Sequence, residues 1–121
     1  MRVAFATQDC EHVDELRLTS HLVVFEVTGG GAEVHRVFAF PSGRRTGTEA
    51  RIRTILDADL VVVAAIGPSL AVRLASQGVR PVTAPGGARI RDVVAALARE
   101  VAELERPVRR AARAAADRAV S

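Results

Sequence analysis

The sequence contains no lysine, asparagine, tyrosine or tryptophan, and phenylalanine is its only aromatic residue type. A single cysteine, Cys10, excludes an internal disulfide and predicts a reducing, cytoplasmic setting. The longest apolar run, residues 60–67, is too short to cross a membrane. Residues 1–20 carry charges throughout and lack the apolar stretch of a signal peptide. We therefore expect a cytoplasmic protein without a membrane span, from a GC-rich bacterial coding sequence.

The basic charge of the chain comes from arginine alone. The net charge is +3 and the isoelectric point is about 10.8. Because arginine does not titrate in the useful range, this isoelectric point overstates a small excess of charge. Single-stranded nucleic acids are usually bound on aromatic side chains within a basic groove, and aromatic residues are nearly absent here. The composition therefore argues against nucleic acid as a partner.

The hydrophobic pattern predicts an α/β domain. Residues 1–7 and the hairpin over 21–40 have strand character, and the apolar run 60–66 is typical of a strand buried on both faces. Pro81 places the strand over 79–84 at a sheet edge. Helical periodicity follows a capping box at Thr46–Glu49 and recurs over 68–78 and 88–104. We expect a mixed sheet of five strands, with an antiparallel hairpin beside parallel βαβ units and helices on its faces.

The last residues, 105–121, differ in composition from the domain over 1–104. They are rich in alanine and arginine, which predicts an extra C-terminal helix that begins near Pro107. Its basic side chains fall on one stripe, at Arg106, Arg109, Arg110 and Arg113. Two interpretations stay open: a solvated terminal helix, or a docking surface for an acidic partner or nucleic acid.

The carboxyl ends of the parallel strands predict the binding site, because ligands of open α/β sheets gather there. Cys10 and His12 follow the first strand and offer side chains that iron prefers, so they are the best candidate metal or cluster ligands. His21 begins the second strand and is a weaker candidate. Backbone contacts are expected from two glycine-containing turns, at Gly67, Pro68 and Ser69 and at Gly86 and Gly87. An ordinary polar loop at Cys10 and His12 is the alternative.

Several motifs together resemble a known family. They are "RVAFATQDCEHVDE" at 2–15, "FEV" at 25–27, "LDADLVVVAAIGP" at 56–68 and "IGPSLAVRLASQGVRPVTAPGG" at 66–87. Over about residues 1–100 the chain is similar to the dinitrogenase iron–molybdenum cofactor biosynthesis family, which includes NifX and NafY carriers and the C-terminal domain of NifB. The resemblance implies a ribonuclease-H-like fold and a non-enzymatic protein without catalytic residues. It further implies transient binding of an iron–sulfur or iron–molybdenum cofactor precursor, and nitrogenase-maturation proteins as partners.

One segment departs from that family pattern. Members commonly carry His-Phe-Gly just after the match to Val13 and Asp14, where this chain has Leu16-Arg17-Leu18. The departure leaves an alternative function, an interaction or regulatory module of the same fold that has lost the cofactor site. A metal-dependent nuclease is a remoter hypothesis. It would require the acidic residues near the first strand to meet Glu26 and Asp59.

Overall fold

The computed structural model describes residues 1–40 and 47–120. The elements run β1 (Arg2–Thr7), a 3₁₀ turn η1 (Leu16–Leu18), β2 (His21–Thr28), β3 (Gly31–Ala39), α1 (Thr48–Thr54), β4 (Leu60–Val63), α2 (Pro68–Ser76), β5 (Arg80–Thr83) and α3 (Ile90–Val120). The strands form one sheet in the order β3-β2-β1-β4-β5. Strands β1, β4 and β5 are parallel, and β2 is antiparallel to both neighbours. The predicted mixed five-stranded sheet and its ribonuclease-H-like arrangement are confirmed.

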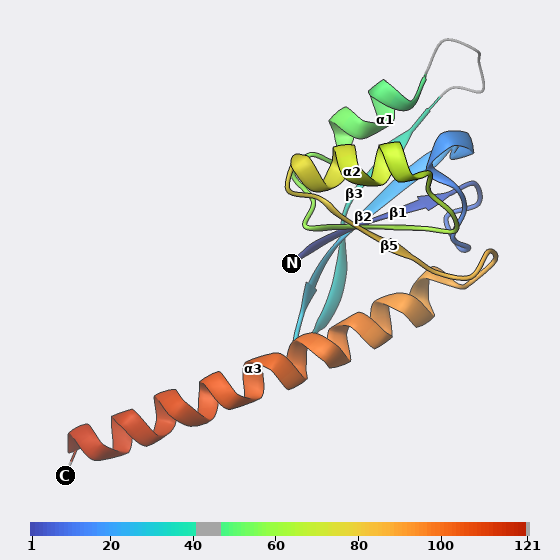
Figure 1. The fold of residues 1–121 in the computed structure, drawn as a ribbon. Helices are drawn as coiled ribbons and strands as arrows, with labels where there is room; N and C mark the ends of the chain where they lie inside the picture. The colour runs from blue at the N-terminus through green and yellow to red at the C-terminus, as the bar shows by residue number, and fades with distance from the viewer. Residues whose placement is uncertain (41–46, 121) are drawn as a thin grey trace.

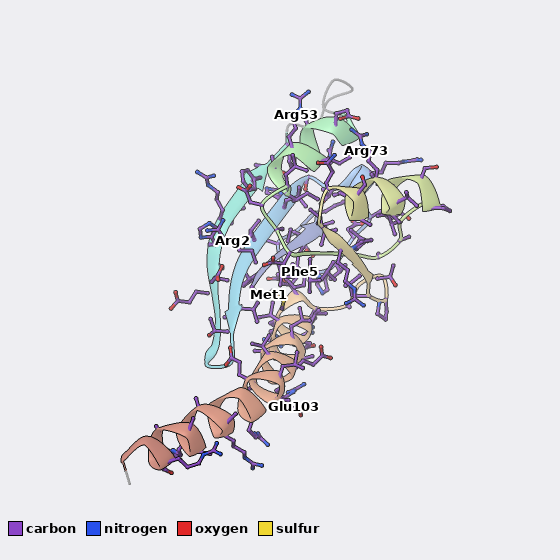
Figure 2. The ribbon with its side chains drawn as sticks, turned by 60° about the vertical axis from the view of Figure 1, so that its left-hand side comes forward. Met1, Arg2, Phe5, Arg53, Arg73 and Glu103 are labelled. Carbon is purple, nitrogen blue, oxygen red and sulfur yellow. The ribbon has the colours of Figure 1, made fainter. Side chains whose placement is uncertain are left out.

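The sheet has an apolar core on each face. In β1, Ala4 and Ala6 point to the side of α1 and α2, while Val3 and Phe5 point to the side of α3. Figure 2 shows Arg53 of α1 and Arg73 of α2 on the side of the sheet away from α3. Strand β4 is buried on both faces, which is why its sequence is apolar without alternation. The predicted cover of helices on both faces is therefore present.

Pro81 lies in β5 at the edge of the sheet, as its missing N–H predicted.

The capping box predicted over Thr46–Glu49 begins at Thr46, which lies outside the described residues. Within them, α1 begins after Gly47 without a side-chain cap. The carboxylate of Glu49 instead accepts hydrogen bonds from Arg73 and thereby links α1 to α2.

Helix α3 is longer than the sequence pattern indicated. The stretches 88–104 and 105–121, expected as two helices, form one continuous helix from Ile90 to Val120, and position 107 lies inside it rather than in a first turn. Alanine and arginine are strong helix formers, which favours this continuation. The helix crosses the sheet and then extends past it (Figure 1). Gly29 in the β2–β3 turn lies close to this helix, because a Cβ there would meet Oε2 of Glu105 and lie 3.3 Å from Cα of Ala102.

No described helix is both long enough and apolar enough to cross a membrane.

Candidate functional site

The loop after β1 is held by the loop after β5 through backbone hydrogen bonds. The N–H of Val13 donates to the carbonyl of Ala88 over 2.8 Å, and the N–H of Ile90 donates to the carbonyl of Glu11 over 2.8 Å. The N–H of Gly87 in turn donates to the carbonyl of Val13 over 3.3 Å. The structure therefore brings together two of the three strand-end loops that the sequence singled out, and it holds them in a fixed arrangement.

Asp9 organises the turn that carries the candidate ligands. Its Oδ1 accepts the backbone N–H groups of Glu11 and His12 over 2.9 and 2.8 Å. Its Oδ2 lies 2.6 Å from Nδ1 of His12. The hydrogen bond to the His12 side chain, followed by those from the two backbone amides, lowers the pKa of Asp9 well below its usual range. Asp9 is thus ionised at neutral pH and orients the imidazole.

Cys10 sits at the tip of this turn with an exposed side chain. Its φ of 62° is in the left-handed region, and within the described residues no other non-glycine residue has a positive φ. For a residue with a Cβ this conformation costs roughly 1–2 kcal/mol. The hydrogen bonds around Asp9 and the pairing with the β5 loop hold Cys10 in it. The thiol is accordingly presented outward.

Cys10 and His12 line the same cavity, of about 700 Å³, together with Glu11. The opposite wall comes from the β2–β3 hairpin and the first turns of α3. Its residues are Phe25, Gly31, Ala32, Arg89, Ile90, Arg91, Val94, Ala95 and Ala98. The two predicted ligands therefore share one concave surface of a size usual for small-ligand sites.

His12 also lines a second hollow, of about 530 Å³. Gly86 and Gly87 line this hollow, with Gln8, Asp9, Val13 and Asp14. Gly87 has a φ of 81°, so the turn before α3 uses the conformational freedom of glycine. His12 thus lies between the cavity of Cys10 and the glycine turn.

The remaining predicted site residues lie elsewhere. Gly67 lines a separate hollow beside Leu16 and Arg17, and Pro68 begins α2. Ser69 follows on the same helix and is exposed. His21 pairs with Thr7 in the sheet, and its Nδ1 lies 2.8 Å from Oγ of Ser20. Neither cavity that contains His12 includes these four residues.

The structure adds Glu11, which the sequence reasoning did not consider, and Asp9, which it considered only for the nuclease hypothesis, to the residues around His12. One donor atom from each of Asp9, Glu11 and His12 falls within 4.8 Å of the others. The local signal was the tetrapeptide Asp-Cys-Glu-His, in which each residue carries a metal-binding side chain. The chemistry of the loop is therefore a mixture of carboxylate, thiol and imidazole.

The acidic residues required for a nuclease do not converge. Glu26 pairs with Arg2 and with the N-terminal amine, and Asp59 accepts the backbone N–H of Arg2. Arg2 begins β1 and Asp9 follows its end, and the six residues of β1 place the two ends of the strand about 16 Å apart. The nuclease hypothesis therefore finds no site in the described residues.

The comparisons with known proteins agree with this architecture. The crystal structure of PH0822 superposes with a TM-score of 0.64 and 27% identity, covering 81% of this chain and 89% of that one. The NMR structure of a NifB-like protein of the DUF35 family from Thermotoga (TM1290) gives a TM-score of 0.58 at 16% identity, covering 83% and 89%. No curated protein matches the chain. A family model described as dinitrogenase iron-molybdenum cofactor matches residues 1–100. The chain thus belongs to the dinitrogenase iron–molybdenum cofactor family.

Proposed function

We propose that the protein is a non-enzymatic cytoplasmic carrier that holds an iron–sulfur or iron–molybdenum cofactor precursor and delivers it to nitrogenase-maturation proteins. The observation that carries this proposal is the placement of Cys10 and His12 on one hydrogen-bonded turn at a shared cavity. The family to which the chain belongs supplies the class of cargo.

The ligand set suits a transient contact. A thiolate and an imidazole are both good ligands for iron, but two protein ligands are fewer than a closed metal site requires. A cluster that arrives with its own ligands could exchange one or two of them for Cys10 and His12 and later leave. Asp9 engages Nδ1 of His12, which leaves Nε2 for the cargo. The backbone of Gly86 and Gly87 would form the wall beyond His12.

Gly67, Pro68 and Ser69 are not needed for this arrangement, and neither is His21. Their predicted contact with the cofactor stays a prediction, since they lie apart from the two hollows that contain His12.

An anaerobic titration tests the carrier function. A synthetic [4Fe–4S] cluster with exchangeable thiolate ligands is added to the protein, and the charge-transfer absorption is followed. We expect saturable binding that Cys10→Ala and His12→Ala each weaken by about tenfold, the effect of losing roughly 1.4 kcal/mol. His35→Ala is the matched control because His35 is exposed on β3, away from the site. Absence of binding, or equal binding by all three variants, would contradict the proposal.

A second candidate is an interaction or regulatory module that keeps the fold without the cofactor. The observation that favours it is Leu16, which stands in the segment where the family pattern has His-Phe-Gly and is 1% exposed in the core. A second observation in its favour is the charge of residues 105–121, which contain five arginines and two acidic residues. The excess of +3 equals the net charge of the whole chain, which suits an acidic partner protein. A folded protein that binds no cluster in the titration would support this candidate.

A further inference from the structure

The cavity beside Cys10 has two chemically different parts. Its polar mouth contains Cys10, Glu11 and His12, and Arg89 and Arg91 lie there too, at the start of α3. Its floor is apolar and consists of Phe25, Val94 and Ala98 with their small neighbours. The proposed carrier function uses the loop residues alone, so the floor and the two arginines are left without a role.

The cavity exists because small residues face one another where α3 passes the β2–β3 hairpin. Gly31 and Ala32 are on the hairpin, and Ala95 and Ala98 are on the helix. Phe25 is held in place by Phe5, with ring centroids 5.5 Å apart and planes at 85°. Figure 2 shows Phe5 in the middle of the sheet. Val94 is 8% exposed and belongs to the core on this face. The floor is therefore formed before any ligand arrives.

The mouth of the cavity is positively charged. Arg89 and Arg91 flank the N-terminus of α3, the end of the helix that carries partial positive charge. Within residues 1–40 and 47–120, neither arginine has an ion-pair partner. Glu11 is the one acidic residue in the lining, so arginines outnumber it two to one. Two free guanidinium groups over an apolar floor complement an anion with an apolar body.

We propose that this cavity binds a small organic anion, with a carboxylate, sulfonate or phosphate group at Arg89 and Arg91. Its apolar body lies on Phe25, Val94 and Ala98. The volume of about 700 Å³ lies within the range usual for sites of this kind. This ligand class goes beyond cluster carriage, because the residues that recognise it are not those proposed to contact the cluster.

The anionic apolar dye 8-anilinonaphthalene-1-sulfonate is a direct probe, with N-phenyl-1-naphthylamine as its uncharged counterpart. We expect saturable fluorescence enhancement of both dyes with the folded protein. The double variant R89Q/R91Q should weaken binding of the sulfonate by about fivefold, the effect of removing two exposed charge contacts, and leave the neutral dye within about twofold. R99Q is the matched control, because Arg99 is an exposed arginine of α3 outside the cavity.

The floor is tested by filling it. Ala98→Leu should weaken binding of both dyes, and Ala95→Leu provides a second variant at an exposed position that the fold tolerates more easily. Thermal melts of every variant exclude dye binding to unfolded chain. Equal sulfonate binding by R89Q/R91Q and R99Q would overturn the proposal, as would unchanged binding by both leucine variants. Retained dye binding beside a failed iron–sulfur titration would count against the carrier function and leave this inference supported.

Discussion

Oδ2 of Asp9 lies 2.6 Å from Nδ1 of His12, three residues away on the same turn. Since the lowered pKa keeps Asp9 ionised, its carboxylate accepts the hydrogen bond and Nδ1 must carry the hydrogen. The tautomer of a neutral His12 is therefore fixed with Nε2 as the free acceptor. One carboxylate thus shapes the backbone of the turn and prepares the imidazole for a ligand.

Asp9→Asn should destabilise the protein at neutral pH, because the amide replaces a charged acceptor of two backbone hydrogen bonds and the bond from His12. A carboxyl group whose pKa is lowered in the folded state stabilises that state above its unfolded pKa. For Asp9 the ordinary value is 3.8. Its contribution is therefore fully present above about pH 5 and falls away as the pH drops from about 4 toward the lowered pKa.

Urea unfolding of the wild type and Asp9→Asn between pH 2.5 and 7 measures this dependence. The difference in midpoint should be largest near neutrality and should shrink in acid. Asp57→Asn is the control, since Asp57 is exposed and accepts none of the loop bonds. A difference between wild type and Asp9→Asn that stays constant over the whole range would show that Asp9 acts through packing instead of charge.

The backbone at Cys10 gives a second prediction. Glycine reaches a φ of 62° without a steric cost, so Cys10→Gly should unfold at an equal or higher denaturant concentration, with a gain of up to about 1 kcal/mol. Cys10→Val should lose about 1–2 kcal/mol, because a β-branched side chain is poorly tolerated there. Chemical denaturation followed by circular dichroism measures both. Equal stability of the glycine and valine variants would show that the left-handed conformation carries no strain.

The fold could be predicted because its signals are local. The unbroken apolar run of β4, the proline of β5 and the glycine turn of the hairpin each act through their own segment. Arg51 shows the limit of such reasoning. It is 7% exposed, it donates to the carbonyl of Thr19 over 2.9 and 2.8 Å, and its guanidinium lies 4.9 Å from the Phe40 ring. A hydrogen-bond partner 32 residues away, Thr19, leaves no periodic pattern in the sequence around position 51.

The sequence likewise predicts only part of the arrangement of the candidate site residues. Cys10 and His12 follow the end of β1, and hydrogen bonds between the loops after β1 and β5 bring Gly86 and Gly87 beside His12. Strand ends do not reveal to which face of the sheet each loop leads. Strand β4 continues into α2 on one face, and β5 continues into α3 on the other. Gly67 and Gly87 follow neighbouring strands yet open into different hollows for this reason.

The part of α3 beyond the sheet provides the last prediction. Deleting residues 107–121 should change the melting temperature by less than about 4 °C, the smallest shift expected for a loss of 1 kcal/mol in a domain of this size. The reason is that every side chain of residues 110–118 is exposed, and the contact of Ala102 and Glu105 with Gly29 is retained. Cluster binding in the anaerobic titration should also be unchanged, since Cys10 and His12 keep all of their partners.

A second truncation after Ala96 is the matched control. It removes Leu97, Ala98 and Val101, which pack against the core on the α3 face. Burying apolar side chains of this kind contributes about 1.5–3 kcal/mol each when burial is complete, so we expect a large fall in melting temperature or no folding. Scanning calorimetry of the two truncations separates the helix into its packed and projecting parts. A comparable fall in melting temperature from the shorter deletion would show that residues 107–121 pack against the domain. The stripe of arginines would then not be a surface free to bind an acidic partner.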